Sequence, residues 1–231
     1  MNIITQVDKH SIADEMGLVP GDVLLTINGK VINDIFDYRY LIKDENLEVA
    51  VKKQSGEEWL LAITKEEDDD LGLLYEHPLM SHEKRCSNKC VFCFIDQNPA
   101  GMRDTIYFKD DDSRLSFLDG NFVTLTNMKD DELARVIFYR LSPINISVHT
   151  TDPALRVEML KNPRAALIME QIQKITDAGL TTNFQIVLCR GLNDGAHLDR
   201  SIRELSGFLP YGQHISIVPL GYLSTVKVCP T

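Results

Sequence analysis

Short apolar segments rich in β-branched residues alternate with longer helical patterns over the second part of the chain, and this alternation constrains the fold most. The expected strands cover residues 121–127, 144–150, 182–188 and 214–220. The expected helices lie between them and cover residues 129–141, 163–179 and 195–209. The strands are nearly continuous in apolar residues, which is typical of a sheet with helices on both faces. Alternation of this kind favours a parallel sheet with right-handed crossovers.

A further strand near residues 73–78 would bring the count to about five βα units. We therefore expect an α/β fold, a partial (β/α) TIM-like barrel that is open rather than closed. In such folds the chemistry takes place at the carboxyl ends of the strands. The last segment, residues 221–231, stops just after an expected strand with no helix to cover it. The sequence thus predicts a barrel that is incomplete, as if truncated at its C-terminal end.

The first part of the chain has a different character, with strand-like segments separated by turn signals such as Pro20-Gly21-Asp22. One helix is expected over residues 11–16, with Ser11 as its N-cap, and a second over residues 32–42. This pattern predicts a small β-rich domain with two helices.

A charge run, KEEDDD at residues 65–70, separates the two patterns. A solvated acidic linker is its simplest interpretation, and the break in composition marks a domain boundary. The expected domains are residues 1–72 and residues 73–231.

Composition excludes several classes of protein. The 231 residues are 44% hydrophobic and 25% charged, as in ordinary soluble globular proteins. A formal net charge of −10 leaves no basic field for non-specific binding, so we do not expect a nucleic-acid partner. No apolar run reaches the length of a membrane span, and the N-terminus lacks the pattern of a secretory signal. We therefore expect a cytoplasmic protein with no membrane partner.

Three of the five cysteines, Cys86, Cys90 and Cys93, fall in the short segment KRCSNKCVFCFIDQ. In a reducing compartment, clustered cysteines are metal ligands or catalytic groups more often than disulfides. A structural zinc site would need a fourth ligand from elsewhere. The candidates for it are His82, Cys189 and Cys229. An iron–sulfur cluster held by three thiolates would instead leave one iron open for a small molecule.

The spacing Cys86-x3-Cys90-x2-Cys93, with Phe92 just before the last cysteine, resembles the signature loop of the radical S-adenosylmethionine (SAM) superfamily. The resemblance implies a partial barrel and a [4Fe–4S] cluster bound by the three cysteines. It implies that SAM binds the fourth iron and is cleaved by one electron to methionine and a 5′-deoxyadenosyl radical. It further implies an oxidoreductase-like enzyme that takes its electron from a donor such as flavodoxin or ferredoxin.

Two longer segments, residues 88–127 and 141–153, together resemble one bacterial family within that superfamily. In this family a PDZ-like domain precedes the radical SAM core and a domain of unknown function follows it. We find no counterpart of that last domain in the sequence. The resemblance leaves the substrate open, either a small molecule or a polypeptide.

The segment SIADEMGLVPGDVLLTINGKVI, residues 11–32, resembles part of a PDZ domain. PDZ domains bind extended peptides by adding a strand to the edge of a sheet. Residues 70–76 would supply the peptide-binding strand from the far end of the domain, as in circularly permuted bacterial versions. The groove would then be filled from within or would take a peptide ligand, and both alternatives stay open.

Further candidate cofactor residues stand at expected strand ends. The chain has no Gly-Gly-Glu tripeptide, which many radical SAM proteins use to hold the amino group of SAM. Thr124, Thr126 and Asn127 stand at the matching position and carry polar groups for SAM. A simple turn, with Asn127 as a helix cap, is the alternative. His149 follows the next strand and is either a contact to SAM or substrate or an ordinary satisfied polar residue.

Other residues are open between site roles and structural roles. Asp152 precedes Pro153, an arrangement that also suits a helix N-cap. Cys189 is expected to be a buried thiol. The triplet Asp110-Asp111-Asp112, with Arg114, would build a polar wall, bind a cation or form a solvated loop. Arg103 and Lys109 are candidates for contacts to anionic groups of a substrate. Gln185, Asn193 and Asp194 are candidates for contacts to the cofactor.

The leading interpretation is a radical SAM enzyme that binds a [4Fe–4S] cluster and SAM and acts on an unknown substrate. One alternative is a non-enzymatic scaffold, stabilised by zinc or an iron–sulfur cluster, in which the PDZ-like domain carries the function. A second alternative is an inactive truncated remnant that binds the cluster without cleaving SAM.

Overall fold

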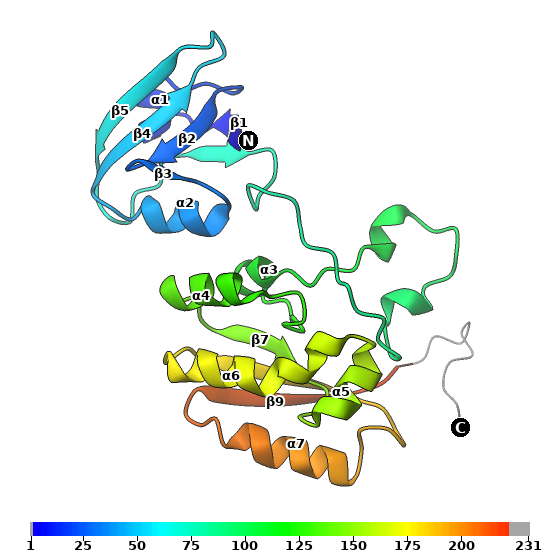
Figure 1. The fold of residues 1–231 in the computed structure, drawn as a ribbon. Helices are drawn as coiled ribbons and strands as arrows, with labels where there is room; N and C mark the ends of the chain where they lie inside the picture. Colours follow the sequence, from blue (N-terminus) through cyan, green and yellow to red (C-terminus); the bar gives the residue numbers. More distant parts are fainter. Residues whose placement is uncertain (1, 222–231) are drawn as a thin grey trace. The chain divides into compact units, whose positions relative to one another are not determined.

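The computed structural model describes residues 2–221, and the chain divides into two compact units, Met1–Glu83 and Lys84–Thr231 (Figure 1). The first unit contains most of the strands and the second most of the helices. Among the described residues, no helix combines the length and the apolar character needed to cross a membrane.

The N-terminal unit is an antiparallel sheet with two short helices. Its strands are β1 (Asn2–Val7), β2 (Val23–Ile27), β3 (Lys30–Val31), β4 (Asn46–Lys52), β5 (Glu58–Thr64) and β6 (Leu73–Tyr75). Its helices are α1 (Ile12–Glu15) and α2 (Ile35–Leu41). The strand order is β5-β4-β2-β1-β6, and β3 pairs with β2 beside this path. The expectation of a small β-rich domain with two helices is confirmed.

Side-chain caps fix where these helices begin. Ser11 accepts a hydrogen bond from the backbone N–H of Asp14 ahead of α1. Asp34 accepts from the N–H groups of Phe36 and Asp37 ahead of α2. Such caps satisfy donors that have no partner inside the helix. Because Asp34 is the cap, α2 begins later than the expected range of residues 32–42.

Strand β6 belongs to the N-terminal sheet. It pairs with β1, with Ile4 opposite Tyr75 and Val7 opposite Leu73. The ring of Tyr75 also packs edge-on against Tyr38 of α2, with 5.4 Å between the ring centroids. The sequence allowed this segment two roles, and the structure shows the one that completes the N-terminal domain. It is not the first strand of the second unit, and the division falls at residues 83/84 rather than 72/73.

The second unit is built on a parallel sheet in the order β7-β8-β9. The strands are β7 (Ile144–Ser147), β8 (Thr182–Leu188) and β9 (Gly212–Pro219). The α-helices are α3 (Ser113–Leu118), α4 (Asp130–Phe138), α5 (Pro153–Leu160), α6 (Ile168–Asp177) and α7 (Ala196–Ser206). Three short 3₁₀ helices are η1 (Ile95–Gln97), η2 (Asp104–Tyr107) and η3 (Pro163–Leu167).

The parallel sheet is smaller than expected. Residues 121–127 contribute a single parallel bridge, from Val123 to Ile146, instead of a full strand. The chain leaves the sheet after this bridge because Leu125 adopts a φ of +62° and the N–H of Thr124 is bonded to Asp111. The described residues thus show three parallel strands and one bridge, and five βα units are not seen among them.

Helix α5 was not among the expected helices. Its N-cap is Asp152, whose carboxylate accepts the N–H of Leu155 at 3.0 Å, and Pro153 occupies the first helical position. The interpretation of Asp152 as a cap is therefore confirmed. The helix expected over residues 163–179 is present, but its first turn is the 3₁₀ helix η3.

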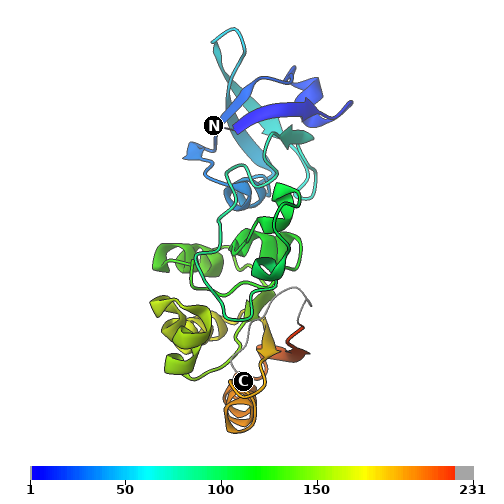
Figure 2. The same cartoon turned by 90° about the vertical axis from the view of Figure 1, so that its right-hand side faces the viewer.

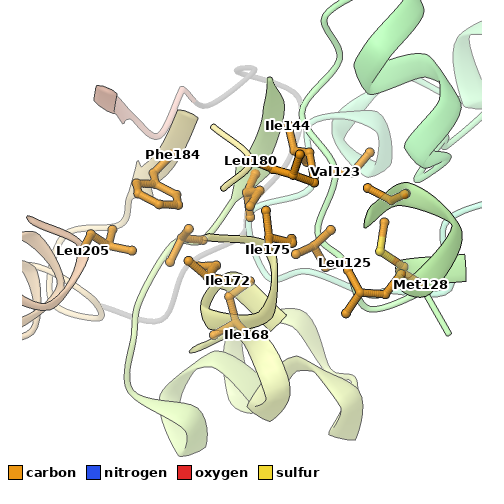
Figure 3. Close-up of a cluster of buried hydrophobic side chains, with 14 of the residues drawn as sticks. Val123, Leu125, Met128, Ile144, Ile168, Ile172, Ile175, Leu180, Phe184 and Leu205 are labelled. Carbon is orange, nitrogen blue, oxygen red and sulfur yellow. The ribbon is translucent and has the colours of Figure 1, made fainter. Parts of the chain in front are cut away.

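The hydrophobic core lies on one face of the parallel sheet (Figure 3). Ile168, Ile172 and Ile175 form one stripe of α6, at the spacing that places side chains on one helix face. Strand residues such as Ile144 and Phe184 pack on this stripe. Figure 2 shows α4 and α6 on the same side of the strands, and both contribute buried residues to this core.

The opposite face of the sheet is polar. Along β8, Phe184 is buried, whereas Asn183 and Gln185 alternate with it and are half-buried. Asn183 Nδ2 donates to Oδ1 of Asn145 on the neighbouring strand at 2.9 Å. The sheet is therefore apolar on one face and polar on the other, rather than apolar on both as expected. The polar face leads to the candidate site.

Candidate functional site

The cysteine loop, residues 86–93, has no helix or strand of its own and is fixed by backbone hydrogen bonds. The N–H of Cys86 donates to the carbonyl of Lys109 at 2.8 Å. Farther along, the N–H groups of Lys89 and Val91 donate to Leu160 at 3.0 Å and Met159 at 2.9 Å, at the end of α5. The positions of the three cysteines therefore depend on helix α5 and on the segment around Lys109.

A cavity of about 840 Å³ lies beside the cysteine loop, a volume typical of a small-molecule site. Ser147, Gln185 and Val218 line it from β7, β8 and β9, toward the carboxyl ends of the strands. Six of the predicted site residues also line it: Cys86, Cys90, Phe92, Cys93, Thr124 and His149. The fold thus brings together at one cavity residues that are far apart in the sequence.

The three thiols influence one another. Burial, followed by the proximity of Cys86 and Cys93, raises the pKa of the Cys90 thiol to about 12. Burial also raises the pKa of the Cys86 thiol, and hydrogen bonds from Asn88 act in the opposite direction. The thiols of Cys86 and Cys90 therefore resist deprotonation until a positively charged metal group balances their charge.

Within residues 2–221, no three His, Cys, Asp or Glu side chains are gathered around the position of a single metal ion. A cubane cluster makes a different demand, because each thiolate binds its own iron atom. Three thiols along one cavity wall fit that demand. The donor set fits as well, because thiolates are the usual ligands of iron–sulfur clusters.

Phe92 and His149 pack together on the cavity wall, with 4.5 Å between their ring centroids. Phe92 is anchored in a small core that includes Met159 and Leu160 of α5. His149 is buried and has a φ of +65°, a backbone conformation that residues other than glycine seldom adopt. Backbone strain of this kind often accompanies a functional site.

His149 is a neutral imidazole. Burial, reinforced by the nearby positive charge of Arg156, lowers its pKa to about 3. Its Nδ1 accepts the backbone N–H of Val187 at 3.2 Å, so the ring proton lies on Nε2. The residue can therefore act as a hydrogen-bond donor at Nε2 at neutral pH, but not as a cation.

Asp111 is a buried carboxylate on the cavity wall. Its oxygens accept the N–H of Thr124 at 2.6 Å and the hydroxyl of Thr124 at 2.5 Å. Asp112 is also buried and pairs with Arg114 at 2.6 Å. Asp110 and Asp111 line the cavity and Asp112 does not, so a polar wall can involve only the first two residues of the triplet and stays a prediction.

Thr126 and Asn127 lie outside the lining of the cavity, and their hydrogen bonds go to the cysteine loop. Thr126 Oγ1 donates to Asn88 Oδ1 at 2.9 Å. Asn127 Nδ2 donates to the carbonyl of Arg85 at 2.9 Å, and its Oδ1 accepts from Ser87 at 2.6 Å. Both residues hold the loop in place here, and contacts from them to SAM stay predictions.

Two buried residues that sequence reasoning missed complete the site. Asn88 joins Thr124, Thr126 and Asn162 through its side-chain amide. Arg156, on α5, is fully buried beneath the cavity wall and donates to four backbone carbonyls. Nothing in the sequence marks either one, because an arginine in a short helix normally reads as a surface residue.

The remaining candidates divide by location. Gln185 and Lys109 line the cavity, and Lys109 is paired with Asp96 at 2.5 Å. Asn193 is buried and supports the wall by donating to the carbonyl of His149 at 2.8 Å. The expectation of a buried thiol at Cys189 is confirmed. Arg103 and Asp194 lie in loops of the second unit and do not line the cavity. His82 lies in the N-terminal unit, and Cys229 lies outside the described residues.

Comparison with protein families gives two matches. A model described as a Radical SAM-like domain matches residues 65–215. A model described as a PDZ domain matches residues 3–53. No curated protein matches the chain. The first match covers most of the chain, including the cysteine loop, strands β7 and β8, and the beginning of β9.

Proposed function

Because the chain belongs to the family of the Radical SAM-like domain, we propose that it is a radical SAM enzyme that binds a [4Fe–4S] cluster and SAM and acts on an unknown substrate. One observation carries the proposal: three cysteines of one loop line a single cavity at the carboxyl ends of the parallel strands. The neutral His149 and the polar wall of Asp111 and Thr124 line the same cavity. In folds of this type, catalysis takes place at that end of the sheet.

Cys86, Cys90 and Cys93 would each hold one iron, and the fourth iron would be left for SAM. When bound, the cluster would supply the one electron for reductive cleavage of SAM, which would give the oxidant that removes a hydrogen atom from the substrate. This chain's own contribution is to position the reactants and to exclude water from them. Phe92 provides apolar surface beside the loop for that purpose.

Polar atoms on the wall would orient SAM. Thr124 and His149 line the cavity and offer a hydroxyl group and an Nε2 donor, respectively. Gln185 adds an amide from the polar face of β8. We assign Thr126 and Asn127 to the same site, where their bonds to the loop would also keep the cysteines in place.

Several finer statements belong to the same proposal. A partial (β/α) barrel would surround the cavity, which the described strands border on one side. An external one-electron donor such as flavodoxin or ferredoxin would reduce the cluster, and the enzyme would act in the cytoplasm in an oxidoreductase-like reaction. The family match supports these statements through the superfamily to which the domain belongs.

Anaerobic reconstitution of the full chain tests the proposal. We expect about four iron and four sulfide per chain, in keeping with a cubane cluster, and 5′-deoxyadenosine from SAM plus dithionite. Cys90→Ser should abolish cluster assembly, whereas Cys189→Ala should retain it, because Cys189 is buried outside the cavity lining. One zinc per chain without iron would contradict the proposal, and so would unchanged iron content in Cys90→Ser. A bound cluster without SAM cleavage would instead support the inactive remnant.

A second function concerns the N-terminal unit. β6 ends the strand order, and its free edge pairs with no other described strand. Helix α2 lies beside it through the contact between Tyr38 and Tyr75. A strand edge next to a helix is where PDZ domains add a peptide strand.

Fluorescence anisotropy of a random peptide pool with free C-termini, titrated with the full chain, should show binding, and Leu74→Pro should weaken it. Failure of every peptide to bind would favour a groove filled from within.

A further inference from the structure

Arg156 is a fully buried arginine on helix α5. Its guanidinium donates to four backbone carbonyls: Val148 from Nε at 2.8 Å, Ala165 from Nη1 at 2.8 Å, and Thr124 and Ser147 from Nη2 at 2.8 and 2.9 Å. Carbonyl dipoles satisfy the donors but leave the net charge of the guanidinium in place. Burying such a charge is costly unless a negative group lies near it.

Arg156 stays positively charged at neutral pH. Burial lowers its pKa to about 9, with Asp111 and Cys90 acting in the opposite direction. The counter-charge within the wall is Asp111, which is linked to Arg156 through one residue. The N–H of Thr124 donates to Asp111 at 2.6 Å, and the carbonyl of Thr124 accepts from Arg156 at 2.8 Å. The wall thus holds the guanidinium of Arg156 and the carboxyl group of Asp111 on either side of Thr124. Burial raises the pKa of the Asp111 carboxyl, whereas the hydrogen bonds from Thr124 and the charge of Arg156 act in the opposite direction.

This pair lies against the cysteine loop. Lys89 and Val91 donate to the carbonyls of Leu160 and Met159, so Cys90 between them is seated on the last turn of α5. Cys90 also packs into the small core formed by that helix end. Arg156 lies one turn earlier on the same helix. Asp111 itself lines the cavity together with the three cysteines.

We infer that Arg156 and Asp111 act as positioning residues that set the reduction potential of the cluster held by Cys86, Cys90 and Cys93. The inference rests on the proposed function and deepens it. In the redox step, one electron passes from an external low-potential donor, such as dithionite, to the cluster, and no bond forms or breaks. The cluster with its thiolates becomes more negative by one charge. Arg156 stabilises this reduced form, Asp111 destabilises it, and both effects are strong in a medium that excludes water.

The test is an anaerobic redox titration of the reconstituted full chain with dithionite, followed by electron paramagnetic resonance of the reduced cluster. Arg156→Gln removes the positive charge and should lower the midpoint potential. Asp111→Asn keeps an acceptor for the N–H of Thr124, removes the negative charge, and should raise the potential. Arg156→Lys retains the charge and should shift the potential less than Arg156→Gln does.

Opposite shifts from opposite charges separate this role from a structural one, since loosening the wall gives no reason for shifts of opposite sign. Lys174→Gln removes one positive charge at an exposed position on α6, where Lys174 is paired with Glu170 and does not line the cavity, and it should leave the potential unchanged. If Arg156→Gln fails to fold or to hold iron, Asp111→Asn alone decides: an unchanged or lowered potential overturns the inference. Absence of iron and sulfide from the unaltered chain would instead overturn the proposed function, so the two failures are distinguishable.

Discussion

At the scale of single residues, Asn88 fixes the cysteine loop to the cavity wall. Its side chain is buried, its Nδ2 donates to Thr124 Oγ1 at 3.0 Å, and its Oδ1 accepts from Thr126 Oγ1 at 2.9 Å. Oδ1 also accepts from Asn162 Nδ2 at 2.8 Å, next to the end of α5. An amide is required at this position because the same side chain must both donate and accept.

We predict that Asn88→Ala loosens the loop. The variant leaves partners of a buried amide unsatisfied, which should lower the free energy of unfolding by about 1–3 kcal/mol and reduce the yield of reconstituted cluster. Urea denaturation and iron content measure the two effects. Asn162→Ala removes only part of this network and serves as a graded control. An unfolding midpoint for Asn88→Ala equal to that of the unaltered chain would show that the amide does not fix the loop.

A second residue-scale prediction concerns acid stability of the N-terminal unit. Asp22 is fully buried, pairs with Lys53 at 2.5 Å and accepts the N–H groups of Val19 and Gln54. Burial alone would raise its pKa, but the hydrogen bonds from Lys53 and from the backbone outweigh it, so the pKa of Asp22 is lowered. A pKa that is lowered in the folded state adds stability when the pH is above the pKa of the unfolded state, near 3.9. This stability is lost as the pH falls through the pKa of the folded state.

Asp22→Asn should therefore destabilise the protein at pH 7 by about 3 kcal/mol, because Lys53 is left without its buried partner. On acidification to about pH 3, the variant should lose less stability than the unaltered chain, because it lacks the carboxylate that titrates there. Urea denaturation at both pH values compares the two proteins. The argument fails if their stability falls equally between the two pH values.

At the scale of helices and strands, periodicity predicted what local sequence controls. The stripe of Ile168, Ile172 and Ile175 marked α6, and the cores of β7, β8 and β9 were found from their apolar runs. The prediction of a strand over residues 121–127 was wrong because the backbone of Thr124 bonds to Asp111, an interaction that the local sequence does not reveal. α5 was missed because it is short and its buried Arg156 gives the helix no clear apolar stripe.

The N-cap of α5 gives a prediction at this scale. Asp152 accepts the N–H of Leu155 at 3.0 Å and also receives Arg200 Nη1 at 2.8 Å. Asp152→Ala should lower the free energy of unfolding by about 1 kcal/mol, measured by urea denaturation. Asn is an equally good cap, so Asp152→Asn should recover most of the loss. If Asn recovered nothing, the ion pair with Arg200 rather than the cap would be the stabilising contact.

At the scale of the whole molecule, the sequence could predict the superfamily, but not which unit each segment belongs to or which remote segments contact each other. The cysteine spacing and the long motifs identified the superfamily, because they resemble its signature loop, and a Radical SAM-like domain model matches residues 65–215. The local sequence could not decide whether β6 belongs to the first unit. That assignment depends on pairing with β1, which lies some seventy residues earlier in the sequence. The polar wall made by Asp111, Thr124 and Arg156 depends in the same way on contacts between remote segments.

The two compact units should respond differently to loss of the proposed cluster. The cysteine loop has no ladder of its own, and its amides rely on a few bonds, such as Cys86 to Lys109 and Val91 to Met159. Strands β4 and β5, in contrast, form a continuous antiparallel pair within the first unit. Segments held by few bonds open locally at low free energy, whereas sheet amides open only with larger units.

We therefore expect that removing the cluster with a chelator, under anaerobic conditions, accelerates hydrogen exchange in residues 84–93 while β4 and β5 stay protected. Mass spectrometry of peptides from the loaded and the chelated full chain measures this. The same treatment of Cys90→Ser, which should hold no cluster, provides the control and should change nothing. Equal acceleration of exchange in β4 and β5 would show that the cluster stabilises the whole chain rather than the cavity wall. Unchanged exchange in the loop would show that the cluster does not bind there.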